Sequence, residues 1–183
     1  MRSRTVLLGA VALLTLAGCN NRGKLDTDPL PPIQQVEQPA ASAGGACILW
    51  DYSFINDKIG VTFDVAAADQ VDDTSICVVQ TVDAQWPDLS ISIVERTQAN
   101  AKQFLDDLKP AKATTLKGLG QAGYRLNSPA SGGHGPVVEI GWLSQAKQLQ
   151  TLRFTFAKTA QAADVTTMDD NLLELAKAMD TTT

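Results

Sequence analysis

Few motifs in this 183-residue chain have residue types and spacings typical of catalysis or ligand binding. The first is a glycine motif. Gly118, Gly120 and Gly123 match the pattern G-x-G-x-x-G of dinucleotide-binding proteins. That chemistry needs a helix beginning at the third glycine, so that the helix N-terminus meets the pyrophosphate. The residues after Gly123 instead have the pattern of a strand followed by a loop. The motif therefore predicts a glycine-rich turn or bulge between strands.

Carboxylates form the second candidate group. Four of them gather near one predicted turn and invite comparison with a calcium site: Asp64, Asp69, Asp72 and Asp73. Calcium needs six to eight oxygen ligands, and the EF-hand spacing with its central glycine and final glutamate is missing. Two adjacent pairs lie on predicted helices: Asp106 with Asp107, and Asp169 with Asp170. Glycosidases need carboxylates opposed across a cleft, so we interpret all of these residues as solvated.

The single histidine, His134, lies in a Ser/Gly/Pro loop at residues 128–136. It could act as a general base for Ser131 or Ser128, but three residues of one flexible loop cannot hold a triad geometry unaided. The nucleophile-elbow pattern G-x-S-x-G is also missing from the sequence. We therefore predict an exposed loop histidine. No catalytic residue, metal site or cofactor is predicted, and the protein is not expected to be an enzyme.

Aromatic side chains could stack on a sugar or line an acyl pocket. Trp86 precedes Pro87 in a connection between predicted strands, and we expect it to be the best single candidate for a ligand-contact residue. Trp142 shares strand parity with Val138 and Ile140, which indicates a core position.

The N-terminus carries a targeting pattern. Arg2 and Arg4 precede an uncharged apolar run at residues 5–17, which as a helix would rise only about 20 Å, short of the roughly 30 Å hydrocarbon core. This length is typical of a signal-peptide core. The run ends in Leu16-Ala17-Gly18-Cys19, which resembles the lipobox of bacterial lipoproteins. That resemblance implies cleavage before Cys19 and attachment of acyl chains, such as palmitate, through its thiol. We expect the lipid on Cys19 to hold the protein at the extracytoplasmic side of the cell membrane.

The remaining cysteines, Cys47 and Cys77, form an even pair in the oxidising exterior that this location implies. We predict a structural disulfide between them. Free thiols or a redox pair are the alternatives, although the C-x-x-C spacing of redox sites is missing.

Composition limits the partners and the architecture. The formal net charge is −5, which argues against a nucleic-acid ligand, and removal of residues 1–18 would take away two arginines and lower it to −7. Residues 19–46 are rich in proline and glycine and predict a disordered tether after the lipidated cysteine. One globular domain is expected at residues 47–180.

Hydrophobic periodicity gives the elements of that domain. Asp51 and Gly60 are placed to begin and end a short helix. Two long amphipathic helices are predicted at residues 97–109 and 162–179. Strands are predicted at residues 59–65, 76–82, 89–93, 113–117, 122–127, 137–143 and 149–156. The predicted class is α+β, with an antiparallel sheet and both long helices packed on one face.

Beyond the lipobox, the cysteine pair, the segment from Leu116 to Tyr124 and the segment from Val138 to Leu143 resemble small actinobacterial cell-envelope lipoproteins of largely unknown function. The order of elements is also similar, more weakly, to the PsbP-like fold of LpqN-type lipoproteins, which are implicated as binding or accessory factors. Both resemblances imply an envelope location, and neither assigns a catalytic residue.

The sequence therefore predicts a non-enzymatic, membrane-tethered module that binds an envelope protein or another envelope component. The alternative is a carrier or sensor of a lipid or other hydrophobic small molecule. The core distinguishes the two hypotheses. If it is closed, the first is favoured, and an apolar cavity would favour the second. The side chains that would either fill the core or line such a cavity are Leu152, Phe154, Phe156 and Leu172.

Overall fold

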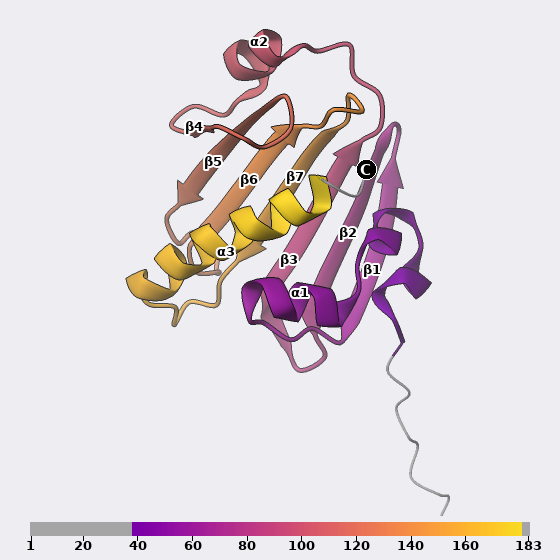
Figure 1. Ribbon diagram of the computed structural model, residues 1–183. Coiled ribbons are helices and arrows are strands. Elements are labelled where there is room, and N and C mark those ends of the chain that lie inside the picture. The colour runs from indigo at the N-terminus through magenta and orange to yellow at the C-terminus, as the bar shows by residue number, and fades with distance from the viewer. Residues whose placement is uncertain (1–37, 181–183) are drawn as a thin grey trace, which may run out of the picture. The chain divides into compact units, whose positions relative to one another are not determined.

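The computed structural model describes residues 38–180. Its centre is one seven-stranded sheet in which every neighbouring pair is antiparallel, in the order β1-β2-β3-β7-β6-β5-β4 (Figure 1). The strands are β1 (Val65–Val71), β2 (Thr74–Thr81), β3 (Ala84–Val94), β4 (Thr114–Leu116), β5 (Ala122–Ser128), β6 (Val137–Leu143) and β7 (Leu149–Thr155).

The sheet consists of two meanders. β1, β2 and β3 form the first, and β4 to β7 form the second, each with sequence neighbours side by side. The pairing of β3 with β7 joins them in the middle of the sheet. There Leu89 pairs with Phe154 and Ile91 with Leu152, which places four apolar side chains of both meanders on one face.

Two helices cover that face. α1 (Tyr52–Ile59) begins at Asp51, whose Oδ1 accepts a hydrogen bond from the Ser53 N–H at 2.8 Å. It ends at Gly60, whose φ of 72° is the left-handed conformation that glycine adopts without strain. The longer α3 (Ala162–Asp180) crosses the second meander (Figure 1). We name the side of the sheet beneath α1 and α3 the helical face.

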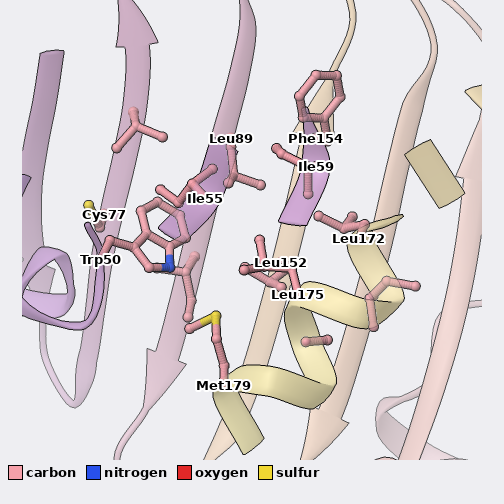
Figure 2. Packing of buried hydrophobic residues seen from close by; sticks show 14 of the residues in the cluster. Trp50, Ile55, Ile59, Cys77, Leu89, Leu152, Phe154, Leu172, Leu175 and Met179 are labelled. Atoms are coloured by element: carbon pink, nitrogen blue, oxygen red, sulfur yellow. The ribbon is translucent and has the colours of Figure 1, made fainter. Parts of the chain in front are cut away.

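The main hydrophobic core lies between the helical face and these two helices. Figure 2 shows Leu172, Leu175 and Met179 of α3 packed toward Leu152 of β7, with Trp50 and Ile55 closing the side nearer Cys77. Most of these side chains are fully buried. Burial of this kind contributes about 1.5–3 kcal/mol per large apolar side chain, so the core holds the two meanders in register.

The predicted disulfide is confirmed. Cys47 lies in η2 (Gly45–Leu49) and Cys77 in β2, with their Cα atoms 5.0 Å apart and both side chains fully buried. The bridge fastens the first segment of the domain to the helical face.

The prediction of two long helices on one face is wrong. Asn100, not Thr97, begins the second helix, through a reciprocal capping box with Gln103. The helix is a single turn, α2 (Ala101–Gln103), which continues as the π-helical turn η3 (Phe104–Leu108) before Pro110. Because the start moves three residues and proline fixes the end, too little chain remains for a long helix. The segment also packs on the opposite side of the sheet. The fold is therefore mostly sheet, with one long helix.

The start of the sheet also differs from the prediction. Residues 59–65 were expected to form a strand, but Ile59 ends α1 and the first strand is Val65–Val71. This strand includes Asp69, which was predicted to lie in the acidic turn. The turn between β1 and β2 therefore consists of Asp72 and Asp73 alone. Asp72 takes a positive φ of 51°, which Asp tolerates better than most residues.

The N-terminal boundary moves as well. Residues 38–46 were predicted to belong to the tether, but they form η1 (Ala40–Ala43) and the beginning of η2. Ala40 is 0% exposed and Ala46 4%, so the packed chain begins before Cys47. The predicted signal peptide, Cys19 and the rest of the predicted tether lie outside the described residues. Among residues 38–180, no helix has both the length and the hydrophobicity to cross a membrane.

Candidate binding surface on the open face of the sheet

The side of the sheet opposite α1 and α3 carries polar side chains, and we name it the open face. Successive residues of a strand point to opposite sides, so the residues between the core positions of β3, β6 and β7 lie together here. Register places Arg153 of β7 between Ser90 of β3 and Glu139 of β6, and Ser92 beside Thr151. Arg153 is exposed and the other four side chains are partly exposed.

Arg153 lies at the centre of this face. Within residues 38–180 its guanidinium makes no hydrogen bond or ion pair, although carboxylates occupy strands on both sides of it. A guanidinium presents five N–H donors in a fixed planar arrangement. Its donors are therefore free to meet a ligand that lies across β3, β7 and β6.

One end of the open face is closed by aromatic packing. The Tyr124 hydroxyl donates to Glu139 Oε1 at 2.8 Å, and its ring stacks on Phe104 of η3 with centroids 5.8 Å apart. Burial and the Glu139 carboxylate raise the pKa of Tyr124 well above its ordinary value, so the hydroxyl stays protonated. The ring needs Gly141 beneath it, since a Cβ there would lie 2.4 Å from Tyr124 Cε1.

The other end carries the predicted contact residue. Trp86 is partly exposed, and its ring lies beside the imidazole of His134, with centroids 5.9 Å apart and planes at 57°. The Trp86–Pro87 peptide bond is cis. His134 Nδ1 lies 2.6 Å from the Gly135 carbonyl oxygen, so the tautomer with a proton on Nδ1 donates there and leaves Nε2 as an acceptor. The contact role of Trp86 stays a prediction.

Backbone hydrogen bonds hold the His134 loop against β7. The Gly135 N–H donates to the Phe156 carbonyl at 2.8 Å, and the Phe156 N–H donates to the Pro136 carbonyl at 2.9 Å. Only glycine fits at position 135, because a Cβ would lie 2.2 Å from the Ala157 carbonyl oxygen. His134 is partly buried, not fully exposed as expected. These hydrogen bonds therefore fix its loop beside the Trp86 ring, and we name the contact between Trp86 and His134 the Trp86 corner.

Asp88 lies between the Trp86 corner and Arg153. Partial burial raises the pKa of its carboxyl above the ordinary value, opposed by a hydrogen bond from Thr155 and by the charges of Arg153 and His134. The carboxylate is thus incompletely solvated yet close to solvent, and it offers a strong acceptor at the edge of the face.

The Asp88→Asn variant should be more stable than the wild type at neutral pH. An acid with a raised folded-state pKa contributes stability that is fully present below its unfolded pKa and is lost as the pH rises through the folded value. Asparagine cannot ionise, so the loss disappears. We expect a Tm about 1–2 °C above wild type at pH 7, kept small by solvent screening, and no difference at pH 3. Thermal melts followed by circular dichroism from pH 3 to 7 test this, and a variant less stable at pH 7 would contradict it.

Sequence reasoning singled out Trp86 but missed the residues around it. Asp88, Glu139 and Arg153 carry no motif. Asp88 and Arg153 belong to the polar half of the alternation in β3 and β7, and Glu139 joins them because β6 pairs with β7. The polar residues of that alternation all point to the side of the sheet opposite the core, so they predict a polar sheet face.

The glycine motif forms the turn between β4 and β5, as predicted. Gly120 has a φ of 53°, and a Cβ there would lie 2.2 Å from the Leu143 carbonyl oxygen. The Gln121 N–H donates to that same oxygen at 2.8 Å. Gly123 lies within β5, so a strand and not a helix follows the motif.

The acidic candidates do not converge on a metal site. Asp64 accepts a hydrogen bond from the Val82 N–H, and Asp106 pairs with Lys102. The interpretation of Asp169 as solvated is wrong, because this residue is buried at 8% exposed and pairs with Arg125 of β5. In the part of the chain that the structure describes, no group of three His, Cys, Asp or Glu side chains could hold a metal ion.

The four core residues whose packing distinguishes the two functional hypotheses are buried. Leu152, Phe154 and Leu172 are at most 1% exposed, and Phe156 is 7% exposed. A surface groove of about 390 Å³ lies at their edge, where Phe154 and Phe156 form part of its wall. Its apolar lining also includes Ile59, Val61, Pro87 and Met168.

Comparison with known protein families, with curated proteins and with solved structures gave no match for this chain.

Proposed function

We propose that this protein is a membrane-anchored lipoprotein of the cell envelope whose domain is a non-enzymatic binding module. The lipobox at Cys19 supports the anchor, and the buried Cys47–Cys77 bridge is consistent with an extracytoplasmic, oxidising location. Neither feature specifies what the domain binds.

The observation that carries the binding function is the contrast between the two sides of the sheet. The helical face is covered by the main core, whose large apolar side chains are almost all buried. The open face instead presents polar side chains and the Trp86 corner to solvent. A surface of this kind binds a partner from outside and does not engulf it.

A second candidate function is a carrier of a hydrophobic small molecule, favoured by the groove of about 390 Å³ beside Phe154 and Phe156. The groove is open to solvent and borders the core at Phe154 and Phe156, so it could hold part of a ligand without enclosing it. We therefore place it second.

Native mass spectrometry of the full-length protein, purified in mild detergent from the cells that make it, tests the proposal. We expect the mass of the chain without residues 1–18 plus an acylated glyceryl group on Cys19, and no stoichiometric lipid beyond that group. The Cys19→Ala variant should carry no acyl mass. Chemical cross-linking before extraction should join the wild-type domain to an envelope component.

The possible outcomes separate the parts of the proposal. An unmodified Cys19 would contradict the anchor. A second, reproducible lipid bound at one equivalent would contradict the pure binding module and support the carrier. A domain that is both empty and never cross-linked would contradict binding altogether.

A further inference from the structure

We propose that the open face binds a neutral glycan chain of the cell envelope, with the Trp86 ring as its stacking platform. This inference rests on the proposed binding function and names the chemical class of the ligand. It depends on four observations: the partly exposed aromatic ring, the hydrogen-bonding groups beside it, their charge balance and the span of the face.

Trp86 is the tryptophan that the fold leaves at the surface. Trp50 is 2% exposed and Trp142 0%, whereas the Trp86 ring is partly exposed and held from one side by His134. An indole combines a large apolar surface with little conformational freedom to lose on binding. The C–H face of a sugar ring is apolar while its rim is hydroxylated, so a fixed indole matches one part of a sugar and the neighbouring polar groups match the other.

The hydrogen-bonding groups beside Trp86 suit a ligand rich in hydroxyls. Each sugar hydroxyl both donates and accepts, so its site must offer both functions. Arg153 supplies unpaired N–H donors, and Asp88 and Glu139 supply carboxylate acceptors on the two neighbouring strands. The hydroxyls of Ser90 and Thr151 can do either.

The charges on the face favour a neutral glycan over an anionic one. Two carboxylates, Asp88 and Glu139, flank the single guanidinium of Arg153, and the whole chain has a formal net charge of −5. A polyanion would be repelled by both the local carboxylates and the overall field. A neutral chain pays no such electrostatic cost.

The span of the face fits an oligomer better than a single sugar. From Asp88 on β3 to Glu139 on β6, the part of the face that is open to solvent crosses β7, which makes two interstrand spacings. At roughly 4.8 Å each, this is about 10 Å of polar surface, with Trp86 beyond Asp88 at its end. A monosaccharide would cover only one end, so affinity should rise with chain length.

The test is isothermal titration of the full chain in detergent with neutral hexaoses of glucose, mannose and N-acetylglucosamine, and with the neutral polysaccharide fraction of the envelope of the cells that make the protein. A sulfated polysaccharide serves as the anionic comparison. Iodide quenching of tryptophan fluorescence reports on Trp86 specifically, because the other two tryptophans are buried. Glycan binding should protect this fluorescence.

Three variants locate the site. Trp86→Ala should weaken binding at least tenfold, and Trp86→Phe should weaken it less because part of the stacking surface remains. Arg153→Ala should weaken binding several-fold. Ile48→Ala is the matched control, because Ile48 is 67% exposed but lies in η2, away from the open face, and it should bind as the wild type does. Melting temperatures exclude unfolding as the cause.

Each result decides the inference. Binding of a neutral glycan that Trp86→Ala weakens at least tenfold supports it. No binding by any hexaose or by the envelope fraction overturns it, as does binding that is strongest for the sulfated polymer or unaffected by Trp86→Ala. If cross-linking from the open face captures a protein while every neutral glycan fails, the proposed binding function survives and only the glycan is wrong.

Discussion

Replacing Cys47 and Cys77 together by alanine should lower the free energy of unfolding by about 3.5 kcal/mol. The bridge spans a sequence separation of 30 residues, and its removal lets the unfolded chain explore more conformations. The value follows from the chain-entropy relation for a loop of that length. Urea denaturation followed by circular dichroism gives the free energy directly, and the midpoint should fall accordingly.

The reduced wild-type protein is the control for this prediction. Reduction opens the same loop without changing the sequence, so its denaturation curve should lie close to that of the double variant. Two alanines also remove little buried volume, which keeps the comparison clean. A loss below 1 kcal/mol would show that the segment around Cys47 is held by packing and not by the bridge.

The second large effect is expected at the Arg125–Asp169 pair. Arg125 Nη1 of β5 donates to Asp169 Oδ2 of α3 at 2.8 Å, and the two side chains are only 26% and 11% exposed. Asp169→Ala would leave the partly buried guanidinium with only the exposed Asp170 carboxylate nearby, 4.0 Å from Arg125 Nη2. Breaking a buried pair costs about 3–5 kcal/mol, and the partial exposure of Arg125 reduces our expectation to about 2–3 kcal/mol.

A double-mutant cycle separates the pair from its surroundings. The combination of Arg125→Met and Asp169→Leu replaces both charges by apolar groups and should lie within about 1 kcal/mol of the wild type. The exposed pair Lys177–Glu174 provides the comparison, where Lys177→Ala should cost less than about 0.5 kcal/mol. Additive effects of the two substitutions at Arg125 and Asp169 would contradict a direct interaction.

Local signals in the sequence predicted the elements that local chemistry determines. Asp51 and Gly60 mark the ends of α1 because one side-chain acceptor and one left-handed residue suffice to begin and end a helix. The alternation at residues 137–143 and 149–156 placed β6 and β7 to within one residue. Burial on one side imposes that alternation whatever the partner strand.

Elements determined by their neighbours were predicted poorly. β1 contains three alanines, an aspartate and a glutamine, none of which favours a strand, and its conformation comes from pairing with β2. The apolar residues at 97–109 have the spacing of one face of a helix. That spacing could not show that Asn100 would begin the helix or that Phe104 would pack beside Tyr124 on the other face.

The candidate site was only half predictable for the same reason. Trp86 stood out as an aromatic residue in a connection, but its neighbours come from distant parts of the chain. Asp88 meets Thr155 through the β3–β7 ladder, and His134 reaches Trp86 because the loop hydrogen-bonds to Phe156. Neither contact has a local sequence pattern.

The arrangement of the sheet as two meanders sets the order in which the chain can fold. Within each meander the strands are joined by short connections, so pairing closes only small loops and costs little entropy. The ladder between β3 and β7 pairs Val94 with Leu149 and Asp88 with Thr155, positions more than fifty residues apart. Docking of the second meander on the first is therefore the step with the largest loop-closure cost. A chain that emerges N-terminus first can form β1 to β3 and the Cys47–Cys77 bridge early, but its core and its open face exist only once β7 has arrived.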